Sequence, residues 1–415
     1  MTIHPVLGGL FEAWDHAEVV WAALRVPEAP ERPEGDVDLL LETRTAHAAR
    51  RIAFRHGFVE VPGRRDGLHL LKLDEERAQW LWLHCVTELA FGPYLGVRPG
   101  LENRWLAERR QAGGWTVLAP GVEFWLTLMH ALLDQGRVSD RSARRLAATA
   151  AEASAEGPLP ETLAPLLPEG ATPAGVLALA RGGNWPALER LVPQARDAAT
   201  RRGRPPLPAR ATGWVRRTAT ALREVGHRRG VRVALLGPDG AGKSTLAEGL
   251  LATSVFPVRQ VYMGLTGGWL RRVDKLRVPG VVRVGRLLVI WGRYLRGLYH
   301  ACLGRLVVFD RYIYDAEVPT PYPLTRWGRM ARWMDGRACP GPDLVLILDA
   351  PGEIMHKRKG EYTAEMLEAW RQRFLGVQGR ARRAAVLDTT QPPEAVRAEA
   401  MRQIWRCYAE RWGRR

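Results

Sequence analysis

The second half of the chain is patterned by short apolar runs, which alternate with stretches whose apolar residues recur at helical spacing. Five of these runs predict strands, at 231–236, 258–263, 305–309, 343–348 and 384–387. Strands that are apolar on both faces are typical of a parallel sheet whose crossover connections are helices. The pattern therefore predicts an α/β domain over residues 230–415, with a parallel sheet flanked by helices.

The first 155 residues show a different pattern. Apolar runs predict strands at 19–25 and 37–41, and two further runs at 68–73 and 80–86 flank a polar turn and predict a hairpin. Helical spacing predicts helices at 43–56, 122–135 and 140–153, the last with Ser139 as its N-cap. We therefore expect an α+β domain over 1–155, with a mixed sheet and a helical extension.

Residues 156–229 separate the two patterns. The stretch 157–173 is rich in Pro, Gly, Ala and Glu and predicts a boundary loop, which a short helical segment follows at 173–199. The basic, proline-containing run 201–210 then predicts a stiff linker that leads into an amphipathic helix at 212–227. We expect this region to join two domains as a proline-rich linker with helices.

Charge divides the chain in the same way. The first 150 residues carry 18 Lys and Arg against 20 Asp and Glu, whereas the remaining residues carry 43 against 24. With 46% hydrophobic residues the chain lies outside the disordered class. A strongly basic second half indicates polyanionic ligands, such as a phosphorylated substrate, a nucleic acid or an anionic membrane surface.

Cysteine usage and hydropathy exclude several classes of protein. The four cysteines, at 85, 302, 339 and 407, form no C-x-x-C pair, so neither a zinc site nor a disulfide framework is indicated. The most apolar long stretch, 281–303, contains four arginines and fails the test for a transmembrane helix. The first residues lack the pattern of a secretory signal. We expect a cytoplasmic protein with reduced thiols and no transmembrane segment.

The sequence Gly237-Pro-Asp-Gly-Ala-Gly-Lys-Ser244 follows a predicted strand and precedes a predicted helix, which is the context that a phosphate-binding P-loop requires. The glycines at 237, 240 and 242 let backbone N–H groups converge on phosphates, Lys243 reaches the β and γ oxygens, and the Ser244 hydroxyl binds Mg²⁺. We expect Ala241 and Thr245 to complete the nucleotide-binding loop. The motif predicts ATP and Mg²⁺ as cofactors.

A second candidate follows another predicted strand, Leu306-Val-Val-Phe-Asp310. Ligands of open α/β sheets bind at the carboxyl ends of the strands, where Asp310 is expected to lie near the metal. The alternative is that Asp310 caps a helix.

Three segments resemble the thymidylate kinase family of nucleoside monophosphate kinases over about residues 231–410. They are 237–245, Phe309-Asp-Arg-Tyr312 and Pro342-Asp-Leu-Val-Leu-Ile-Leu-Asp349-Ala-Pro, of which the Asp-Arg-Tyr element is the most specific. The resemblance implies that Arg311 contacts the acceptor phosphate, that Asp310 works at the metal and acceptor, and that Asp239 positions an acceptor hydroxyl.

The resemblance also implies a mobile basic lid, for which His356-Lys-Arg-Lys-Gly-Glu361 is the candidate. Its cations Lys357, Arg358 and Lys359 would stabilise charge on the transferring phosphoryl group, with Arg358 expected to act in catalysis. A solvated helix end is the alternative for this run.

Two departures from the family leave the acceptor open. After Tyr312 the chain has Ile313-Tyr-Asp-Ala-Glu-Val-Pro-Thr-Pro321 in place of the family's Ser and aromatic-Gln stretch. In addition, the segment 271–305 is strongly basic. At about 100° per residue, Arg283, Arg286, Arg293 and Arg296 share one face of a helix, opposite Val284, Leu288, Trp291 and Leu295. That basic face could bind a phosphorylated acceptor or an anionic surface, and a solvated charged face is favoured over both.

In the first domain, Gly35-Asp36-Val37-Asp38 places two carboxylates on the same face of a strand. Paired acids of this kind hold Mg²⁺ for nucleotidyl transfer, and the run resembles the metal-binding strand of nucleotidyltransferase-fold proteins. For a third ligand the sequence offers His84, Glu88 or Asp74, and the family's usual Gly-Ser pair upstream is missing. An inactive domain, or a strand that merely begins with exposed acids, is the alternative.

Together these features predict an enzyme that transfers the γ-phosphoryl group of ATP to a small, anionic acceptor, phosphorylated or sugar-containing. The order of the domains resembles fused nucleotidyltransferase-like and thymidylate-kinase-like proteins of bacterial surface-polysaccharide biosynthesis. The alternatives are a true thymidylate kinase, a nucleotide-dependent nucleic-acid-binding module, and a first domain that itself transfers nucleotides. The sequence leaves a homodimer open.

Overall fold

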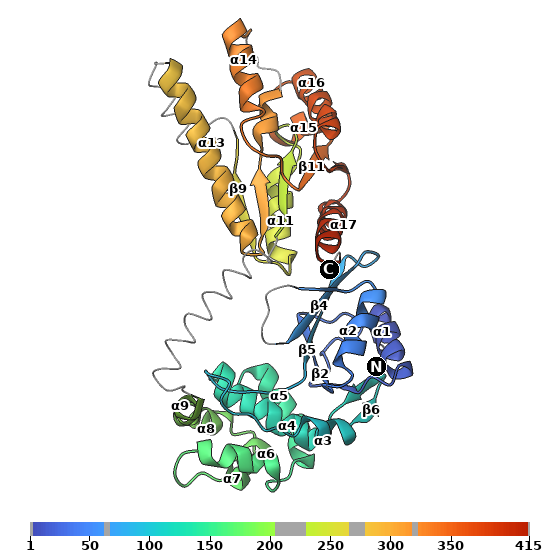
Figure 1. Ribbon diagram of the computed structural model, residues 1–415, viewed down its shortest axis with the longest axis vertical. Coiled ribbons are helices and arrows are strands. Elements are labelled where there is room, and N and C mark those ends of the chain that lie inside the picture. Colours follow the sequence, from blue (N-terminus) through green and yellow to red (C-terminus); the bar gives the residue numbers. More distant parts are fainter. Residues whose placement is uncertain (1–2, 62–66, 204–229, 265–278, 318–322, 414–415) are drawn as a thin grey trace. The chain divides into compact units, whose positions relative to one another are not determined.

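The computed structural model describes residues 3–61, 67–203, 230–264, 279–317 and 323–413, with only the backbone described at 279–283 and at 317 (Figure 1). Contacts divide the chain into two compact units. The first contains residues 1–72 and 81–218, and the second contains 73–80 and 219–415. The helix expected at 212–227 and most of the expected linker lie outside the described residues. No described helix is long and apolar enough to cross a membrane.

The first unit is built on a mixed seven-stranded sheet with the order β3-β4-β5-β2-β1-β7-β6. Its strands are β1 Trp21–Ala23, β2 Asp36–Leu41, β3 Val59–Glu60, β4 Leu68–Asp74, β5 Gln79–Val86, β6 Arg110–Ala112 and β7 Trp115–Val117. β2 runs antiparallel to β1 and parallel to β5. The strands and hairpin expected from the apolar runs are confirmed, whereas the hairpin of β6 and β7 was not foreseen.

Helices bury apolar side chains against both faces of this sheet. Helices α1 (Pro5–His16) and α2 (Ala46–Arg55) share one core with the strands. A second core gathers α3 (Glu102–Ala107), α4 (Pro120–Met129), a π-helical turn at His130–Gln135 and α5 (Asp140–Thr149). The Ser139 side chain accepts a hydrogen bond from the Ser142 N–H at 3.2 Å, which confirms the expected N-cap of α5.

The segment 158–203 packs into this second core. It forms α6 (Pro158–Leu163), α7 (Pro173–Arg181), α8 (Trp185–Glu189) and α9 (Val192–Gly203). Leu163, Val176, Leu188 and Ala195 are buried there together with residues of α4 and α5. These helices are therefore part of the first unit's core, a role that the composition of the region did not indicate.

The second unit contains a five-stranded sheet with the order β12-β11-β8-β10-β9, in which every pairing is parallel. Its strands are β8 Arg232–Leu236, β9 Val258–Tyr262, β10 Leu306–Asp310, β11 Leu344–Asp349 and β12 Ala384–Asp388. The five strands expected from the apolar runs, and the α/β class with helices flanking a parallel sheet, are confirmed.

Helices cover both faces of this sheet, and its central strands β8, β10 and β11 are buried except for one end residue of each. α13 (Pro279–Cys302) and α16 (Ala364–Leu375) contribute Ile290, Tyr294 and Phe374 to a core on one face. α11 (Lys243–Thr253) and α17 (Pro393–Trp412) contact each other and lie against the strands on the other. Two shorter helices, α14 (Arg326–Asp335) and α15 (Gly352–Lys359), follow β10 and β11.

Since all five strands are parallel, the loops that follow them meet at one edge of the sheet. From β8 the chain passes to β9 at one edge of the sheet and returns to β10, which lies beside β8. It then passes to β11 and β12 on the other side of β8. A sheet of this kind binds its ligands at the carboxyl ends of the strands, near the point where the order reverses. The loops after β8, β10 and β11 therefore define the candidate site of the second unit.

Candidate functional site

The loop between β8 and α11, residues 237–242, is here called the glycine loop. Gly240 has a φ of 85° and Gly242 has a φ of 95°. Residues other than glycine adopt such values only at a cost in free energy. A Cβ added at Gly240 would lie 2.5 Å from the carbonyl oxygen of Met355. The loop therefore depends on glycine both for its turn and for its close approach to α15.

Lys243 begins α11 and folds back over the glycine loop. Its Nζ donates hydrogen bonds to the carbonyl oxygens of Gly237 and Pro238, over 2.8 and 2.7 Å, and the residue is 9% exposed. Burial, together with the positive charge of Arg311, lowers the pKa of Lys243 to about 8 against the opposing effect of nearby carboxylates. A buried cation thus lies at the centre of the loop, close to the N-terminus of α11.

Arg311 connects the loop after β10 to the glycine loop. Its Nη2 donates to Oδ1 of Asp239 at 2.8 Å, and its Nη1 lies 3.5 Å from Oδ2 of Asp315. Arg311 has a φ of 65°, a left-handed conformation that costs about 1–3 kcal/mol and occurs most often at functional sites. Burial acts against the charge on Arg311, but the two carboxylates outweigh it and raise its pKa.

The run 356–361 forms the end of α15 and the turn that follows it, and its cations point in different directions. Lys359 Nζ lies 3.9 Å from Asp239 Oδ1 and 3.2 Å from Glu361 Oε1. Arg358, by contrast, donates from Nη2 to the carbonyl oxygen of Thr389 over 2.8 Å. The structure therefore brings Lys359 to the glycine loop and places Arg358 beside the loop that follows β12.

The remaining expected residues lie around the same edge of the sheet. Ala241 is fully buried, whereas Ser244 and Thr245 are exposed in the first turn of α11. Asp310 ends β10, where the strand register pairs it with Leu235 of β8, two residues before the glycine loop. Asp310 therefore ends the strand that neighbours β8, the strand that leads into the glycine loop and Ser244.

Asp315 was not singled out by the sequence reasoning. Its side chain is 12% exposed, and it lies next to Arg311 in a short 3-10 turn at Ile313–Glu317. Burial raises the pKa of Asp315 to about 6, although Arg311 and Lys243 act to lower it. The signal was its position four residues after Arg311, which in a helical turn places the two side chains on one face.

The basic face of α13 was expected to meet solvent, but two of its arginines contact other parts of the second unit. Arg286 Nη1 lies 3.5 Å from Oδ2 of Asp335, which is buried, and Arg293 donates to the carbonyl oxygen of Gly264 at 2.8 Å. Arg296 is exposed, while the side chain of Arg283 lies outside the described residues. The opposite, apolar face of the helix is the one that meets solvent.

In the first unit, Asp36, Asp38 and His84 come together as a candidate metal site. Parallel pairing of β2 and β5 sets Asp38 beside His84, and one ligand atom from each of the three lies within 4.8 Å of the others. Asp36 is exposed and Asp38 is buried. The sequence predicted both carboxylates, and the structure selects His84 over Glu88 and Asp74 as the third member.

Asp38 already has partners of its own. Arg25 donates to Oδ2, with Nε at 2.7 Å and Nη2 also in contact, and Nδ1 of His84 lies 2.9 Å from Oδ1. Burial alone would raise the pKa of Asp38, but the hydrogen bonds from His84 and Arg25 outweigh it and hold the pKa below its ordinary value. Asp38 is therefore a carboxylate that the fold keeps ionised.

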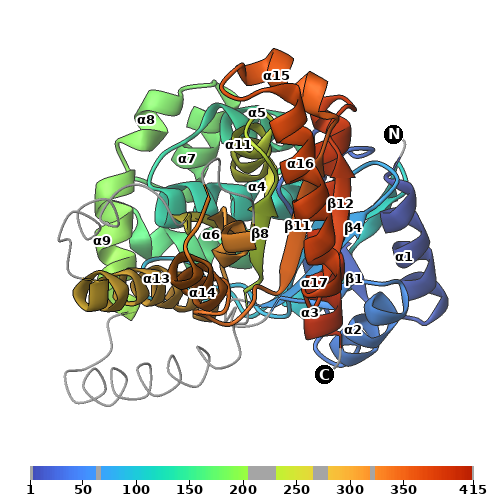
Figure 2. The same ribbon diagram turned by 90° about the horizontal axis from the view of Figure 1, so that it is seen from above.

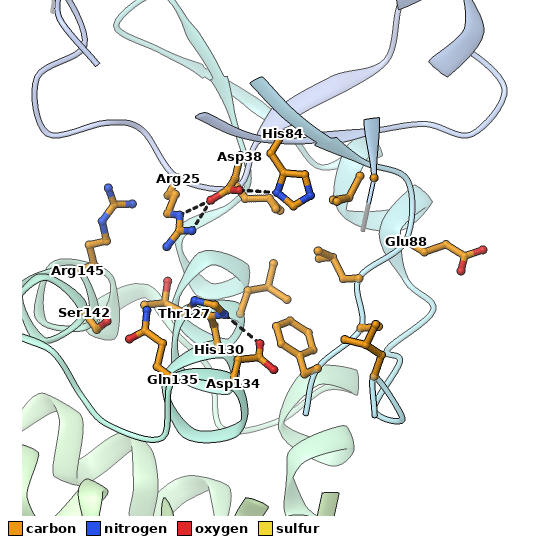
Figure 3. A pocket seen from close by; sticks show the side chains of 18 of the residues that line it. Arg25, Asp38, His84, Glu88, Thr127, His130, Asp134, Gln135, Ser142 and Arg145 are labelled. Atoms are coloured by element: carbon orange, nitrogen blue, oxygen red, sulfur yellow. Dashed lines mark hydrogen bonds and ion pairs between the residues drawn. The ribbon is translucent and has the colours of Figure 1, made fainter. Parts of the chain in front are cut away.

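These residues line a pocket of about 610 Å³ (Figure 3). On its other side, the π-helical turn supplies His130, whose Nδ1 lies 2.9 Å from Oδ2 of Asp134. The Gly92 N–H donates to the second oxygen of Asp134 at 2.7 Å, which fixes the carboxylate. Arg25, Arg141 and Arg145 add positive charge to the lining. The pocket therefore offers two histidine–aspartate pairs and several guanidinium groups to a ligand.

Neither the models of known protein families nor the curated proteins contain a match to this chain.

Proposed function

We propose that the second unit is an ATP-dependent phosphotransferase of the P-loop type, which transfers a phosphoryl group to a small, anionic acceptor. The observation that carries this proposal is the convergence of Lys243, Arg311 and Lys359 on Asp239 within the glycine loop. Three cations that share one carboxylate, at the N-terminus of a helix, form a strong site for a polyphosphate.

The residues fit a nucleotide with Mg²⁺. Gly237, Gly240 and Gly242 carry no side chains, and in a loop of this kind backbone N–H groups bind phosphate oxygens. Ser244, exposed in the first turn of α11, and Asp310, at the end of β10, would hold the metal. ATP with Mg²⁺ would supply the phosphoryl group that is transferred.

The protein's contribution is to position groups and neutralise charge. Lys243 now donates to carbonyl groups of its own loop, and it can exchange these bonds for bonds to phosphate without moving far. Arg311 would hold an anionic group on the acceptor, and Asp239 would accept a hydrogen bond from the acceptor's hydroxyl. Lys359 would stabilise negative charge on the transferring group.

The nature of the acceptor follows from the charges around it. Arg311 is an arginine in a fixed position, which favours a phosphate or carboxylate bound through two hydrogen bonds. A nucleoside monophosphate and a phosphorylated sugar both satisfy this requirement, and thymidylate is one member of the first group. A screen of nucleoside monophosphates, phosphorylated sugars and free sugars, with ATP consumption as the readout, distinguishes them.

The screen also tests the proposal. We expect acceptor-dependent ATP consumption that disappears in Lys243→Ala, while the variant keeps its circular dichroism spectrum. Equal turnover in Lys243→Ala and in the natural protein would refute the assignment.

The candidate metal site of the first unit, formed by Asp36, Asp38 and His84, supports a second candidate function, metal-dependent nucleotidyl transfer. Asp38 and His84 line a pocket large enough for a nucleotide, and guanidinium groups line it as well. Asp36 offers a ligand atom within 4.8 Å of those of Asp38 and His84. An imidazole among the ligands suits Mn²⁺ or Zn²⁺ better than Mg²⁺, which prefers oxygen. The test is pyrophosphate release from nucleoside triphosphates in the presence of Mn²⁺, with Asp36→Ala as the matched variant. Pyrophosphate release that persists in Asp36→Ala would exclude this candidate metal site as the site of nucleotidyl transfer.

A further inference from the structure

Two helices of the second unit carry their apolar side chains on the outside. On α13, Val284, Leu288, Trp291, Leu295 and Tyr299 follow one another at helical spacing and are between 41% and 68% exposed. On α14, Trp327, Met330, Trp333 and Met334 are between 41% and 80% exposed. Helices on the surface of a globular protein ordinarily turn such a stripe toward the core.

Arginines occupy the inner side of both helices. On α13, Arg286 and Arg293 contact Asp335 and the Gly264 carbonyl. On α14, Arg332 donates to the carbonyl oxygens of Ala316 and Asp315, both over 3.0 Å. The fold thus anchors α14 by polar contacts, anchors α13 by polar contacts and by buried side chains such as Ile290 and Tyr294, and leaves a separate apolar stripe of each helix outward.

Helix α13 runs along the second unit, and its first half comes near α14 (Figure 1), while Figure 2 shows both helices from a second direction. The Arg286–Asp335 contact joins the first half of α13 to the last residue of α14. We call the exposed stripes of α13 and α14 together the apolar surface.

Charge around the apolar surface has one sign. α13 contains no Asp or Glu, and the single acid of α14, Asp335, is buried. The cations Arg296, Arg326, Arg329 and Arg337 are exposed, and Arg337 stacks 4.4 Å from the ring centroid of Trp333. The described part of these helices therefore presents apolar groups and positive charge with no exposed carboxylate.

The positive charges indicate which kind of partner the apolar surface binds. A second copy of the chain would bring the same arginines against one another across a two-fold axis, with no acid on either helix to neutralise them. A single-stranded nucleic acid would stack on aromatic rings, but much of the stripe is aliphatic, such as Leu288 and Met330. An anionic bilayer satisfies both features at once, because its acyl chains take the apolar groups and its headgroups take the arginines.

We propose that the apolar surface binds the second unit to the surface of an anionic lipid membrane. Trp327 and Trp333 would lie at the level of the headgroups, where an aromatic ring can be buried on one side and hydrated on the other. Arg326 and Arg329 would extend along the apolar surface to reach lipid phosphates. The proposed attachment is peripheral, with the two helices lying on the surface of the bilayer. This inference is independent of the proposed phosphotransferase activity.

The test is flotation of the full chain with vesicles of phosphatidylcholine and phosphatidylglycerol, compared with vesicles of phosphatidylcholine alone. We expect binding to the anionic vesicles that weakens as salt is added. The variant with both Trp327→Asp and Trp333→Asp should bind at least about tenfold more weakly, because it loses the inserted rings. Arg326→Gln and Arg329→Gln should each cost about fivefold, and they leave the apolar groups intact.

Two matched variants control for general effects. Tyr94→Asp changes an exposed aromatic residue of the first unit, and Arg382→Gln removes an exposed cation far in sequence from both helices. Both should bind vesicles as the natural protein does. Failure of the natural protein to float with anionic vesicles would overturn the proposal, as would unchanged binding in the Trp and Arg variants. Light scattering that shows a dimer, which the Trp327→Asp/Trp333→Asp variant splits into monomers, would assign the surface to a second copy instead.

Discussion

Arg311 and Asp239 join two loops that are 72 residues apart in sequence, through a hydrogen bond of 2.8 Å from Nη2 to Oδ1. The bond lies at the carboxyl edge of the second unit's sheet, between the loop after β10 and the glycine loop after β8. Asp315 contacts the other side of the same guanidinium. Arg311 is therefore held in a strained backbone conformation by carboxylates from two directions, with its charge directed at the proposed phosphate site.

The first prediction concerns that guanidinium. Arg311→Lys keeps the charge but loses the fork of N–H donors that reaches both Asp239 and an acceptor. We expect kcat/KM for the acceptor to fall by about 100-fold, or about 3 kcal/mol. The measurement is steady-state ATP consumption with the acceptor that the screen identifies. Arg382→Gln, which changes a distant exposed cation, is the control, and equal loss in both variants would contradict a role at the acceptor.

The second prediction concerns Asp315. Its pKa is raised above the ordinary value to about 6, mainly by burial, so the folded state binds this proton more tightly than the unfolded chain does. Ionisation of Asp315 therefore lowers the free energy of unfolding as the pH rises from about 4 to about 6. Asp315→Asn removes the buried charge and should stabilise the protein at pH 7 by about 1 kcal/mol.

The advantage of Asp315→Asn should shrink as the pH falls below 6 and vanish below about pH 3, where the natural side chain is protonated in both states. Urea unfolding at a series of pH values measures it. A variant that is less stable than the natural protein at pH 7 would show that the contact with Arg311 outweighs the cost of burial.

The third prediction concerns the charge on Lys243. Its pKa is lowered to about 8, so the side chain is a cation at neutral pH and loses its charge as the pH rises above that value. Since phosphate oxygens bind the cation, affinity for ATP should fall above pH 8, by up to about tenfold per pH unit. Titration calorimetry between pH 7 and 9 measures this. Lys243→Ala should lose the dependence, and an affinity that is flat in the natural protein would exclude Lys243 as the group.

The fourth prediction separates two reasons for a glycine. Gly240→Ala introduces both an unfavourable φ and a Cβ that clashes with the Met355 carbonyl. Gly360→Ala introduces a similar φ of 69°, but its nearest neighbour would be 3.9 Å away. Thermal unfolding should show a loss of about 1 kcal/mol for Gly360→Ala and of clearly more, about 3 kcal/mol, for Gly240→Ala. Equal losses would mean that the close approach to α15 contributes nothing.

The sequence pattern was a good guide to elements that depend on local signals. Apolar runs predict the strands of the second unit, because the central strands of a parallel sheet covered by helices are buried on both faces. The spacing of Gly237, Gly240 and Gly242 before Lys243 likewise locates the glycine loop. The β6–β7 hairpin also carried a local signal that was overlooked, the Gly113-Gly114 pair between two short runs.

The sequence pattern did not predict how each helix is rotated about its own axis, and therefore which of its side chains face the rest of the protein. Periodicity groups the arginines of α13 on one face, but it does not say which face meets the sheet, and Asp335 and the Gly264 carbonyl decide that in the fold. In the same way, Arg358 and Lys359 are neighbours about 100° apart on α15, so only the packing of that helix directs Lys359 to Asp239.

The central claim is that the glycine loop binds ATP with Mg²⁺, and titration calorimetry of the full chain with ATP in the presence of Mg²⁺ tests it most directly. We predict saturable binding of one nucleotide per chain at the second unit, about 100-fold weaker in Lys243→Ala and unchanged in Asp36→Ala, which alters only the first unit's site. Binding of equal strength in the natural protein and in Lys243→Ala, or no binding to the natural protein, would contradict the account.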